Sequence, residues 1–349
     1  MIKKTHKILV TGGSGFIGSN FIYNYLSNSK GSIVNFDSLT YAGSGNNLER
    51  LTDEPRYHFV KGSICDAKKL TNLFGKFEFD SVINFAAESH VDRSIEGPKV
   101  FMETNIIGTF NLLDTIRTIW DSNKNFNNEN FRFVHVSTDE VFGSLGPEDD
   151  PFNENSNYKP NSPYSASKAS SDHIVRSYFK TYNFPVVITN CSNNFGPYQF
   201  PEKLIPLTIY NALNKKPIPI YGDGLQVRDW LYVKDHCDAL NKVLQLAGPG
   251  HTYNIGGNNE KTNIDVVKSI CNHLDEIMPN DKFSHCELIE FVKDRPGHDK
   301  RYSVDSSKIQ KELNWKPYET FETGIKKTIK WYLDNQNWMN NIIRDKSHA

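Results

Sequence analysis

The chain has 349 residues, of which 40 are Lys or Arg and 41 are Asp or Glu, so its formal net charge is -1. This balance gives no general attraction to nucleic acid or to an anionic membrane, and neither is expected as a partner. The apolar run near the N-terminus, "KILV", is far too short for a secretion signal or a membrane span, which predicts a cytoplasmic protein. The five cysteines are scattered and form no C-x-x-C pair, so neither a disulfide framework nor a metal site is expected.

Short apolar runs alternate with amphipathic stretches over the first ~190 residues, and the apolar runs are continuous rather than alternating with polar residues. Strands are predicted at 7–13, 32–37, 81–89, 131–138 and 186–193, and helices at 17–28, 66–77, 101–120 and 164–182. Continuous apolar strands separated by helices are typical of a parallel sheet that is covered on both faces. The sequence therefore predicts an α/β fold with a doubly wound, Rossmann-like parallel sheet.

After residue 190 the pattern loosens, because Pro, Gly and Asn interrupt the apolar runs. We expect residues 1–190 to form the main domain and residues 191–349 to form mostly a smaller mixed α/β substrate-binding lobe. The segment 229–257 holds a predicted helix and strand that would return to the main sheet. A second amphipathic helix is predicted at 321–336, and the Asn-rich segment 121–130 is predicted to be a polar surface loop.

A Gly-rich motif, "TGGSGFIG", follows the first predicted strand and precedes a helix. Gly12, Gly15 and Gly18 would allow a tight turn and bring the backbone close to a pyrophosphate at the helix N-terminus. Asp37 ends the next strand, 19 residues after Gly18, where an acid binds the ribose hydroxyls of adenosine and repels a 2′-phosphate. The arrangement predicts an NAD site, against the alternative of a structural glycine turn with an incidental acid.

A second motif, Tyr164-x-x-x-Lys168, opens the helix predicted at 164–182. Residues four apart lie on one face of a helix, so the ammonium can favour the phenolate and lower the pKa of the tyrosine. Tyr164 could then act as a base toward a substrate hydroxyl while hydride leaves for a nicotinamide. A surface Tyr-Lys pair is the alternative.

Two adjacent carboxylates, Asp139 and Glu140, follow the buried strand in "STDEVFGS". Burying charge is costly unless the charge is paired or used, so they indicate either a solvated turn or an acid and a base at an active site.

With these motifs, the chain resembles the extended short-chain dehydrogenase/reductase family. "STDEVFGS" resembles the dTDP-glucose 4,6-dehydratase subfamily more narrowly, and so do "AAESHVDRSI", "NCSNNFGPYQFPEKLIPL", "YGDGLQVRDWLYVKDH" and "DRPGHDKRY". The resemblance implies a hydro-lyase that converts dTDP-glucose to dTDP-4-dehydro-6-deoxyglucose and water, a precursor of deoxysugars such as rhamnose. NAD would stay bound and be recycled.

The resemblance also implies roles for individual residues. Thr138 would bind the C4 hydroxyl, Glu140 would take the C5 proton and Asp139 would protonate the C6 oxygen, while Tyr164 and Lys168 would serve the oxidation. The cofactor contacts would be Gly12, Gly15, Phe16, Ile17, Gly18, Asp37, Ser63, Ile64, Ala86, Ala87, Thr104, Tyr164, Lys168 and Asn194. The substrate contacts would be Ser89, Thr138, Asn193, Lys203, Leu204, Pro219, Tyr221, Arg228, Asn263, Arg295 and His298.

Three positions depart from the subfamily pattern. Ser63 and Ile64 stand where Asp-Ile is usual, the loop at 43–47 is about two residues longer, and Phe142 replaces a Tyr. The first two are expected to affect the affinity for the cofactor rather than the chemistry, and the third to have little effect.

The resemblance further implies a homodimer formed through helices 100–116 and 166–182, which would pack as a four-helix bundle. Two other functions stay open. One is another nucleotide-sugar enzyme of the same fold, an epimerase or a decarboxylase, which the Asp139-Glu140 pair disfavours. The other is a non-catalytic NAD-binding scaffold, which would not need an intact set of these side chains.

Overall fold

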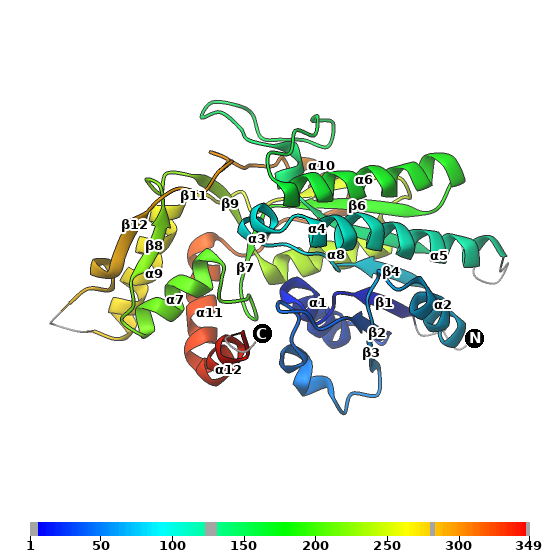
Figure 1. The fold of residues 1–349 in the computed structure, drawn as a ribbon, viewed down its shortest axis with the longest axis horizontal. Helices are drawn as coiled ribbons and strands as arrows, with labels where there is room; N and C mark the ends of the chain where they lie inside the picture. Colours follow the sequence, from blue (N-terminus) through cyan, green and yellow to red (C-terminus); the bar gives the residue numbers. More distant parts are fainter. Residues whose placement is uncertain (1–5, 123–130, 280–282, 347–349) are drawn as a thin grey trace.

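A seven-stranded parallel sheet forms the centre of the larger part of the molecule in the computed structural model, which describes residues 6–122, 131–279 and 283–346 (Figure 1). Its strands follow the order β10 (Thr252–Ile255), β6 (Val186–Cys191), β5 (Arg132–Thr138), β4 (Ser81–Asn84), β1 (Lys7–Thr11), β2 (Ser32–Asp37) and β3 (Tyr57–Lys61). The chain runs outward from β1 to one edge, then returns to β4 and runs to the other edge. Ligands of such sheets bind at this reversal, beyond the carboxyl ends of the strands. The prediction of a doubly wound sheet is confirmed.

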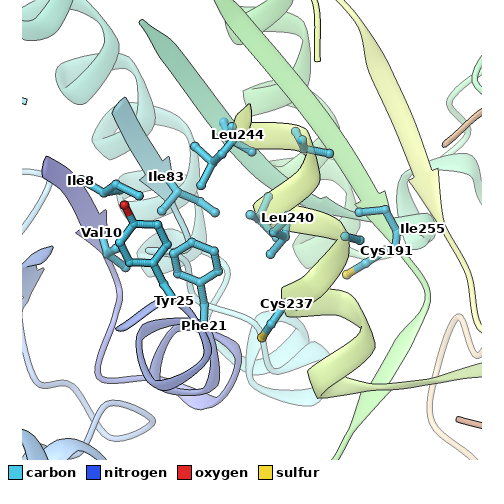
Figure 2. Packing of buried hydrophobic residues seen from close by; sticks show 14 of the residues in the cluster. Ile8, Val10, Phe21, Tyr25, Ile83, Cys191, Cys237, Leu240, Leu244 and Ile255 are labelled. Carbon is cyan, nitrogen blue, oxygen red and sulfur yellow. The ribbon is translucent and has the colours of Figure 1, made fainter. Parts of the chain in front are cut away.

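Helices cover both faces of this sheet because successive strand residues point to opposite faces. Ile8 and Val10 of β1 join one apolar cluster, and Leu9 between them joins the other. The first face is covered by α1 (Phe16–Asn28), α8 (Val233–Leu246) and α10 (Ser307–Leu313), and the second by α2 (Ala67–Lys76), α5 (Thr109–Ser122) and α6 (Pro163–Tyr182). Figure 2 shows the first cluster, where Phe21 and Tyr25 of α1 and Leu240 and Leu244 of α8 lie over the strands.

The smaller lobe contains two short sheets and a core of its own. One sheet joins β7 (Asn193–Phe195), β9 (Val227–Tyr232) and β11 (Glu260–Thr262), and the other joins β8 (Ile218–Tyr221) and β12 (Ile289–Val292). Its helices are α7 (Leu204–Leu213), α9 (Asn263–Ile277), α11 (Phe321–Asp334) and α12 (Gln336–Lys346). The mixed lobe is confirmed, although its strands of three to six residues were too short and too often interrupted to be predicted individually.

Parts of the second half of the chain belong to the core of the main sheet. β10 forms its edge beside β6, and α8 packs against α1. Ile309 and Leu313 of α10 join the same apolar cluster. Segments from both sides of residue 190 therefore meet at this edge of the sheet. The domain boundary at residue 190 stays a prediction.

Short helical segments connect these elements and shape the edge of the sheet. They are η1 (Gly45–Leu51), α3 (Val91–Glu96), α4 (Lys99–Phe101), η2 (Met102–Gly108), η3 (Asp139–Phe142) and η4 (His285–Leu288). The helix predicted at 101–120 contains a π-helical segment, η2, of a kind that is frequent at functional sites. Residues 123–130 of the Asn-rich segment lie outside the described residues.

Candidate active site

The Gly-rich turn after β1 requires glycine for steric reasons. Gly12 has a φ of +70°, and a Cβ there would lie 2.5 Å from the backbone nitrogen of Ala86. A Cβ on Gly18 would lie 2.4 Å from the carbonyl oxygen of Gly12, so the helix starts in close contact with the turn. Gly15 is the N-cap of α1 and offers no side-chain cap. The N–H groups of the first turn are therefore available to an anion.

Asp37 lies at the end of β2, beside this turn. Its carboxylate accepts hydrogen bonds from the backbone N–H groups of Ser14, at 2.9 Å, and Leu39, at 2.7 Å. Burial raises the pKa of Asp37, and the two N–H donors oppose that rise. Each carboxylate oxygen can accept a further hydrogen bond, so the group can still bind a pair of hydroxyls.

A cavity of about 440 Å³ extends along the carboxyl edge of the sheet, at the reversal in strand order. It is lined by the Gly-rich turn, by Asp139 and Glu140, and by Thr104 on the π-helical segment. Every residue predicted to contact the cofactor lines this cavity: Gly12, Gly15, Phe16, Ile17, Gly18, Asp37, Ser63, Ile64, Ala86, Ala87, Thr104, Tyr164, Lys168 and Asn194. The structure thus brings the predicted cofactor residues together around one space.

Each position that departs from the subfamily pattern has defined contacts in the structure. The loop at 43–47 is held against the Gly-rich turn, because Asn47 donates to the Ser14 carbonyl at 2.9 Å. The hydroxyl of Ser63 accepts from the backbone of Cys65 at 3.2 Å. Phe142 is buried in an apolar cluster, with its ring 5.1 Å from that of Phe152.

The carboxylate pair is positioned by the end of β5. Thr138 ends the strand, and its hydroxyl caps η3 by accepting from the Glu140 N–H at 3.2 Å. The same hydroxyl donates to Oδ1 of Asp139 at 3.2 Å. Asp139 is only 2% exposed, and its Oδ2 has no hydrogen-bond partner among the described residues. A buried oxygen without a donor is costly and is typical of a functional group.

The surroundings of the two carboxylates differ in charge. The pKa of Asp139 is raised well above its usual range, first by burial and then by the negative charges of Glu140 and Asp229. Burial also raises the pKa of Glu140, but three cations, Arg295, Lys203 and Arg228, oppose that rise. The pKa of both carboxylates is therefore raised, but further at Asp139, which suits Asp139 as the acid and leaves Glu140 the more readily ionised of the two.

Tyr164 lies at the start of α6, where Ser162 caps the helix and Pro163 takes its first position. The phenol ring packs edge-on against Phe101, with 6.3 Å between the ring centres. Contrary to the expectation from its spacing to Lys168, the pKa of Tyr164 is raised well above 10, by burial and by the negative charge of Glu140. The ammonium of Lys168 donates instead to the Val136 carbonyl at 2.9 Å.

Four predicted substrate residues also line the cavity: Ser89, Thr138, Asn193 and Lys203. The ammonium of Lys203 donates to the Ser89 carbonyl at 3.0 Å. The guanidinium of Arg228 donates to the carbonyls of Val227 and Asp299 and lies 4.3 Å from the centre of the Tyr302 ring.

The other predicted substrate residues do not line the cavity. Arg295 and Tyr221 meet at Asp92 of α3, with 3.1 and 3.3 Å to its carboxylate oxygens. His298 contacts Asp294, at 2.7 Å. Leu204 packs in the core of the smaller lobe, Asn263 begins α9, and Pro219 lies within β8.

Some residues of the site were not predicted. Glu88 lines the cavity, and burial raises its pKa. Asn105 is buried, exchanges two hydrogen bonds with the backbone of Glu88, and donates to the Ser167 hydroxyl at 2.8 Å. It joins the loop after β4 to α6. The sequence predicted a strand to residue 89, but β4 ends at Asn84, and no signal in the sequence pairs Asn105 with the loop that follows.

Comparison with known proteins agrees with this geometry. The family model for GDP-mannose 4,6 dehydratase matches residues 9–328. A dTDP-glucose 4,6-dehydratase of Neisseria meningitidis is 54% identical over 340 residues, which are 97% of this chain and 96% of that protein. The chain belongs to the dTDP-glucose 4,6-dehydratase family.

Solved structures of the family have the same fold. The dTDP-glucose 4,6-dehydratase of Bacillus anthracis, in complex with NAD, is 46% identical with a TM-score of 0.85, and the match covers 97% of this chain and all of that one (100%). DesIV, a dTDP-glucose 4,6-dehydratase of Streptomyces venezuelae with NAD and TYD bound, is 42% identical with a TM-score of 0.87. The match covers 96% of this chain and 99% of that one. Within the described residues, no helix is long and apolar enough to cross a membrane.

Proposed function

We propose that the chain is an NAD-dependent dTDP-glucose 4,6-dehydratase, which forms dTDP-4-dehydro-6-deoxyglucose and water for deoxysugar synthesis. The observation that carries the proposal is the pair Asp139 and Glu140, which line the cavity together with Tyr164 and of which Asp139 has the more strongly raised pKa. A 4-epimerase or a decarboxylase eliminates no water and does not need such a pair. The relatives named above support the proposal.

The residues of the cavity fit NAD. The Gly-rich turn and the uncapped start of α1 suit a pyrophosphate, and Asp37 suits the adenosine ribose and disfavours a 2′-phosphate. NAD, when bound, takes the hydride from C4 of the sugar and returns it to C6. The walls around Ala86, Ala87 and Thr104 would hold it in place.

In the proposed oxidation, Tyr164 accepts the proton of the C4 hydroxyl, which Thr138 positions. Lys168 supplies a positive charge on the same helix face and thereby offsets part of the effect of burial on the phenol. The resulting C4 ketone acidifies the proton at C5.

In the proposed elimination, Glu140 takes the C5 proton and Asp139 gives its proton to the C6 oxygen, which leaves as water. The cations Arg295, Lys203 and Arg228 near Glu140 oppose the rise of its pKa and so support its ionised form. They also suit the diphosphate of the nucleotide sugar. Glu140 returns its proton to C5 as hydride arrives at C6, so the net reaction is redox neutral.

The test is to incubate the purified protein with the dTDP-, UDP-, GDP- and CDP-linked glucoses. The expected result is a 4-keto product that absorbs in alkali and has lost the mass of one water, formed fastest from dTDP-glucose. A C4 epimer formed without loss of water would contradict the proposal.

We also propose a homodimer through α5, η2 and α6. Ile107 of η2 is 53% exposed and Phe110 of α5 is 43% exposed, and Tyr182 at the end of α6 is likewise exposed. Large apolar side chains on neighbouring helices support a partner surface. Light scattering is expected to give the mass of a dimer for the wild type and that of a monomer for Phe110→Glu. The same mass for the two proteins would contradict the proposed dimer.

A cytoplasmic location is proposed on two grounds. The substrate and the cofactor are cytoplasmic metabolites, and all five cysteines are unpaired, as is usual for proteins of reducing compartments.

A further inference from the structure

Behind the cavity wall, three ionisable side chains lie together with almost no exposure to solvent. They are His135 on β5 and Lys168 and Asp172 on α6, with exposed fractions of 0%, 4% and 2%. Only Lys168 also lines the cavity. Neither His135 nor Asp172 contacts the cavity, so the proposed chemistry does not yet use them.

Lys168 has one clear hydrogen bond within the protein, to the Val136 carbonyl at 2.9 Å. Its ammonium also lies 3.4 Å from Nε2 of His135. Burial lowers the pKa of Lys168, and the negative charge of Asp172, four residues further along the helix, opposes that fall. The side chain needs such a partner, because a buried ammonium is stable only when it is paired.

His135 stands between the two charges. Its Nε2 lies 3.4 Å from Oδ1 of Asp172 and 3.4 Å from the Lys168 ammonium. Its Nδ1 faces the amide nitrogen of Asn84 at 3.2 Å, and the amide oxygen of Asn84 accepts from the Thr11 hydroxyl. This network assigns the acceptor role to Nδ1 and the proton to Nε2. That proton faces the Ser171 hydroxyl at 3.1 Å, and Oδ1 of Asp172, which has no hydrogen bond among the described residues, lies a little further away.

The imidazole is neutral, because burial lowers the pKa of His135 to about 4. The charge that faces Lys168 across the ring is therefore that of Asp172. Since Nε2 carries a proton, it gives Lys168 no acceptor, and the remaining N–H bonds of the ammonium stay available to a ligand in the cavity.

Asp172 uses its two oxygens differently. Oδ2 accepts from Ser137 at 2.9 Å, Tyr158 at 3.0 Å and Asn190 at 3.3 Å, so it holds β5, β6 and the loop before α6 together. Oδ1 faces His135. The first set of contacts explains a structural role, which an amide could largely fulfil. The contacts of Oδ2 do not explain why position 172 has an acid rather than an amide. The ammonium of Lys168, on the other side of His135, does explain it.

We propose that Asp172, whose charge faces Lys168 across the His135 ring, is a positioning residue that keeps Lys168 in its charged form at the back of the cavity. The inference rests on the proposed dehydratase function, in which the ammonium of Lys168 supports hydride transfer. It adds two residues, His135 and Asp172, to the machinery of the oxidation step.

Charge removal with little change of shape tests this proposal. Asp172→Asn keeps the size of the side chain and one acceptor oxygen. The groups that titrate around Lys168 are Tyr164, His135 and Cys191, and all three keep their positions in this variant. Tyr158→Phe is the matched control, because it removes one hydrogen bond to Asp172 and leaves the charge.

The first measurement is C4 oxidation alone, with dTDP-6-deoxyglucose as the substrate, because this sugar has no C6 hydroxyl to lose. NADH absorbance then reports hydride transfer as a function of pH. Lys168 loses its charge as the pH rises, so the alkaline limb of the profile should move to lower pH in Asp172→Asn, by about one pH unit. The limb should stay in place in Tyr158→Phe, and in Asp172→Glu, which keeps the negative charge, it should lie close to its wild-type position.

The second measurement is the affinity for NAD, followed by quenching of protein fluorescence between pH 6 and 10. The affinity of Asp172→Asn should begin to fall at a lower pH than that of the wild type. Absence of NADH with the wild-type protein would contradict the dehydratase function, and the NAD titration would still decide the role of Asp172. A loss of stability in Asp172→Asn with both pH limbs unmoved would overturn the inference and leave Asp172 a purely structural residue.

Discussion

Asp37 and Asp139 are two buried carboxylates in one cavity, and the protein treats them in opposite ways. Asp37, in the cofactor half, accepts two backbone hydrogen bonds from Ser14 and Leu39. Asp139, in the sugar half, accepts one hydroxyl, keeps an unpartnered oxygen and faces two further acids, Glu140 and Asp229. The surroundings of Asp37 therefore suit a carboxylate that binds a ligand, whereas those of Asp139 suit a carboxylic acid that donates a proton.

The largest expected effect is that of Glu140→Gln, which removes the base of the sugar half. Elimination should slow by about 10²–10⁴-fold, the range typical of a general base, while C4 oxidation continues. NADH should therefore accumulate on the protein, as followed at 340 nm after mixing with dTDP-glucose. Normal turnover without NADH would show that Glu140 is not the base.

Asp139→Asn is expected to slow the reaction by about 10²-fold, because the amide has no proton to give to the C6 oxygen. The raised pKa of Asp139 keeps the acid protonated at low pH, and wild-type activity should fall as the pH rises past that pKa. The variant should lack this alkaline limb. A 6-fluoro analogue, whose leaving group needs no proton, should recover most of the lost rate, and no recovery would contradict the role of Asp139.

Alanine variants of two glycines in the Gly-rich turn are expected to separate an effect on stability from an effect on the affinity for NAD. Gly12→Ala should lower stability by about 1–3 kcal/mol, because its φ is +70° and its Cβ would collide with the backbone of Ala86. Gly15→Ala should leave the melting temperature almost unchanged, since its Cβ meets only the Gly12 carbonyl, at 3.3 Å. Both should bind NAD more weakly. Equal melting temperatures for the two variants would contradict the steric account of the turn.

The smallest expected effect is that of Asp37→Asn. The amide oxygen can accept from only one of the two backbone N–H groups, and the negative charge is lost. The affinity for NAD should fall by about tenfold, which corresponds to one charge-assisted hydrogen bond, and the preference over NADP should narrow. Calorimetric titration with both dinucleotides measures the two effects, and an unchanged preference would remove Asp37 from the ribose site.

The residues predicted to contact the cofactor lie around one cavity because each of their segments follows a strand of the same sheet. The Gly-rich turn, Asp37 and the loop after β4 each follow a strand of the same parallel sheet, whose carboxyl ends meet at one edge. The sugar half depends on where the smaller lobe lies. The meeting of Arg295 and Tyr221 at Asp92 joins residues more than 100 positions apart, and no local pattern predicts it.

The same limit applies to the electrostatics. Adjacent acids in "STDEVFGS" indicated a catalytic pair, but the pattern does not include the surroundings of each acid. Burial raises the pKa of both, and Glu140 and Asp229 add to the rise at Asp139, whereas Arg295, Lys203 and Arg228 oppose it at Glu140. The spacing of Tyr164 and Lys168 suggested a lowered pKa for the phenol. Burial and Glu140 raise that pKa instead, which a helix-face argument does not include.

The division of labour between Asp139 and Glu140 is tested most directly by exchange at C5. The product, dTDP-4-dehydro-6-deoxyglucose, is incubated in D₂O with the wild type, Asp139→Asn or Glu140→Gln, and its C5 proton is followed by NMR. The account predicts deuterium at C5 with the wild type and with Asp139→Asn, and exchange no faster than in buffer with Glu140→Gln. Rapid exchange with Glu140→Gln, or its loss only with Asp139→Asn, would contradict the assignment of Glu140 as the base.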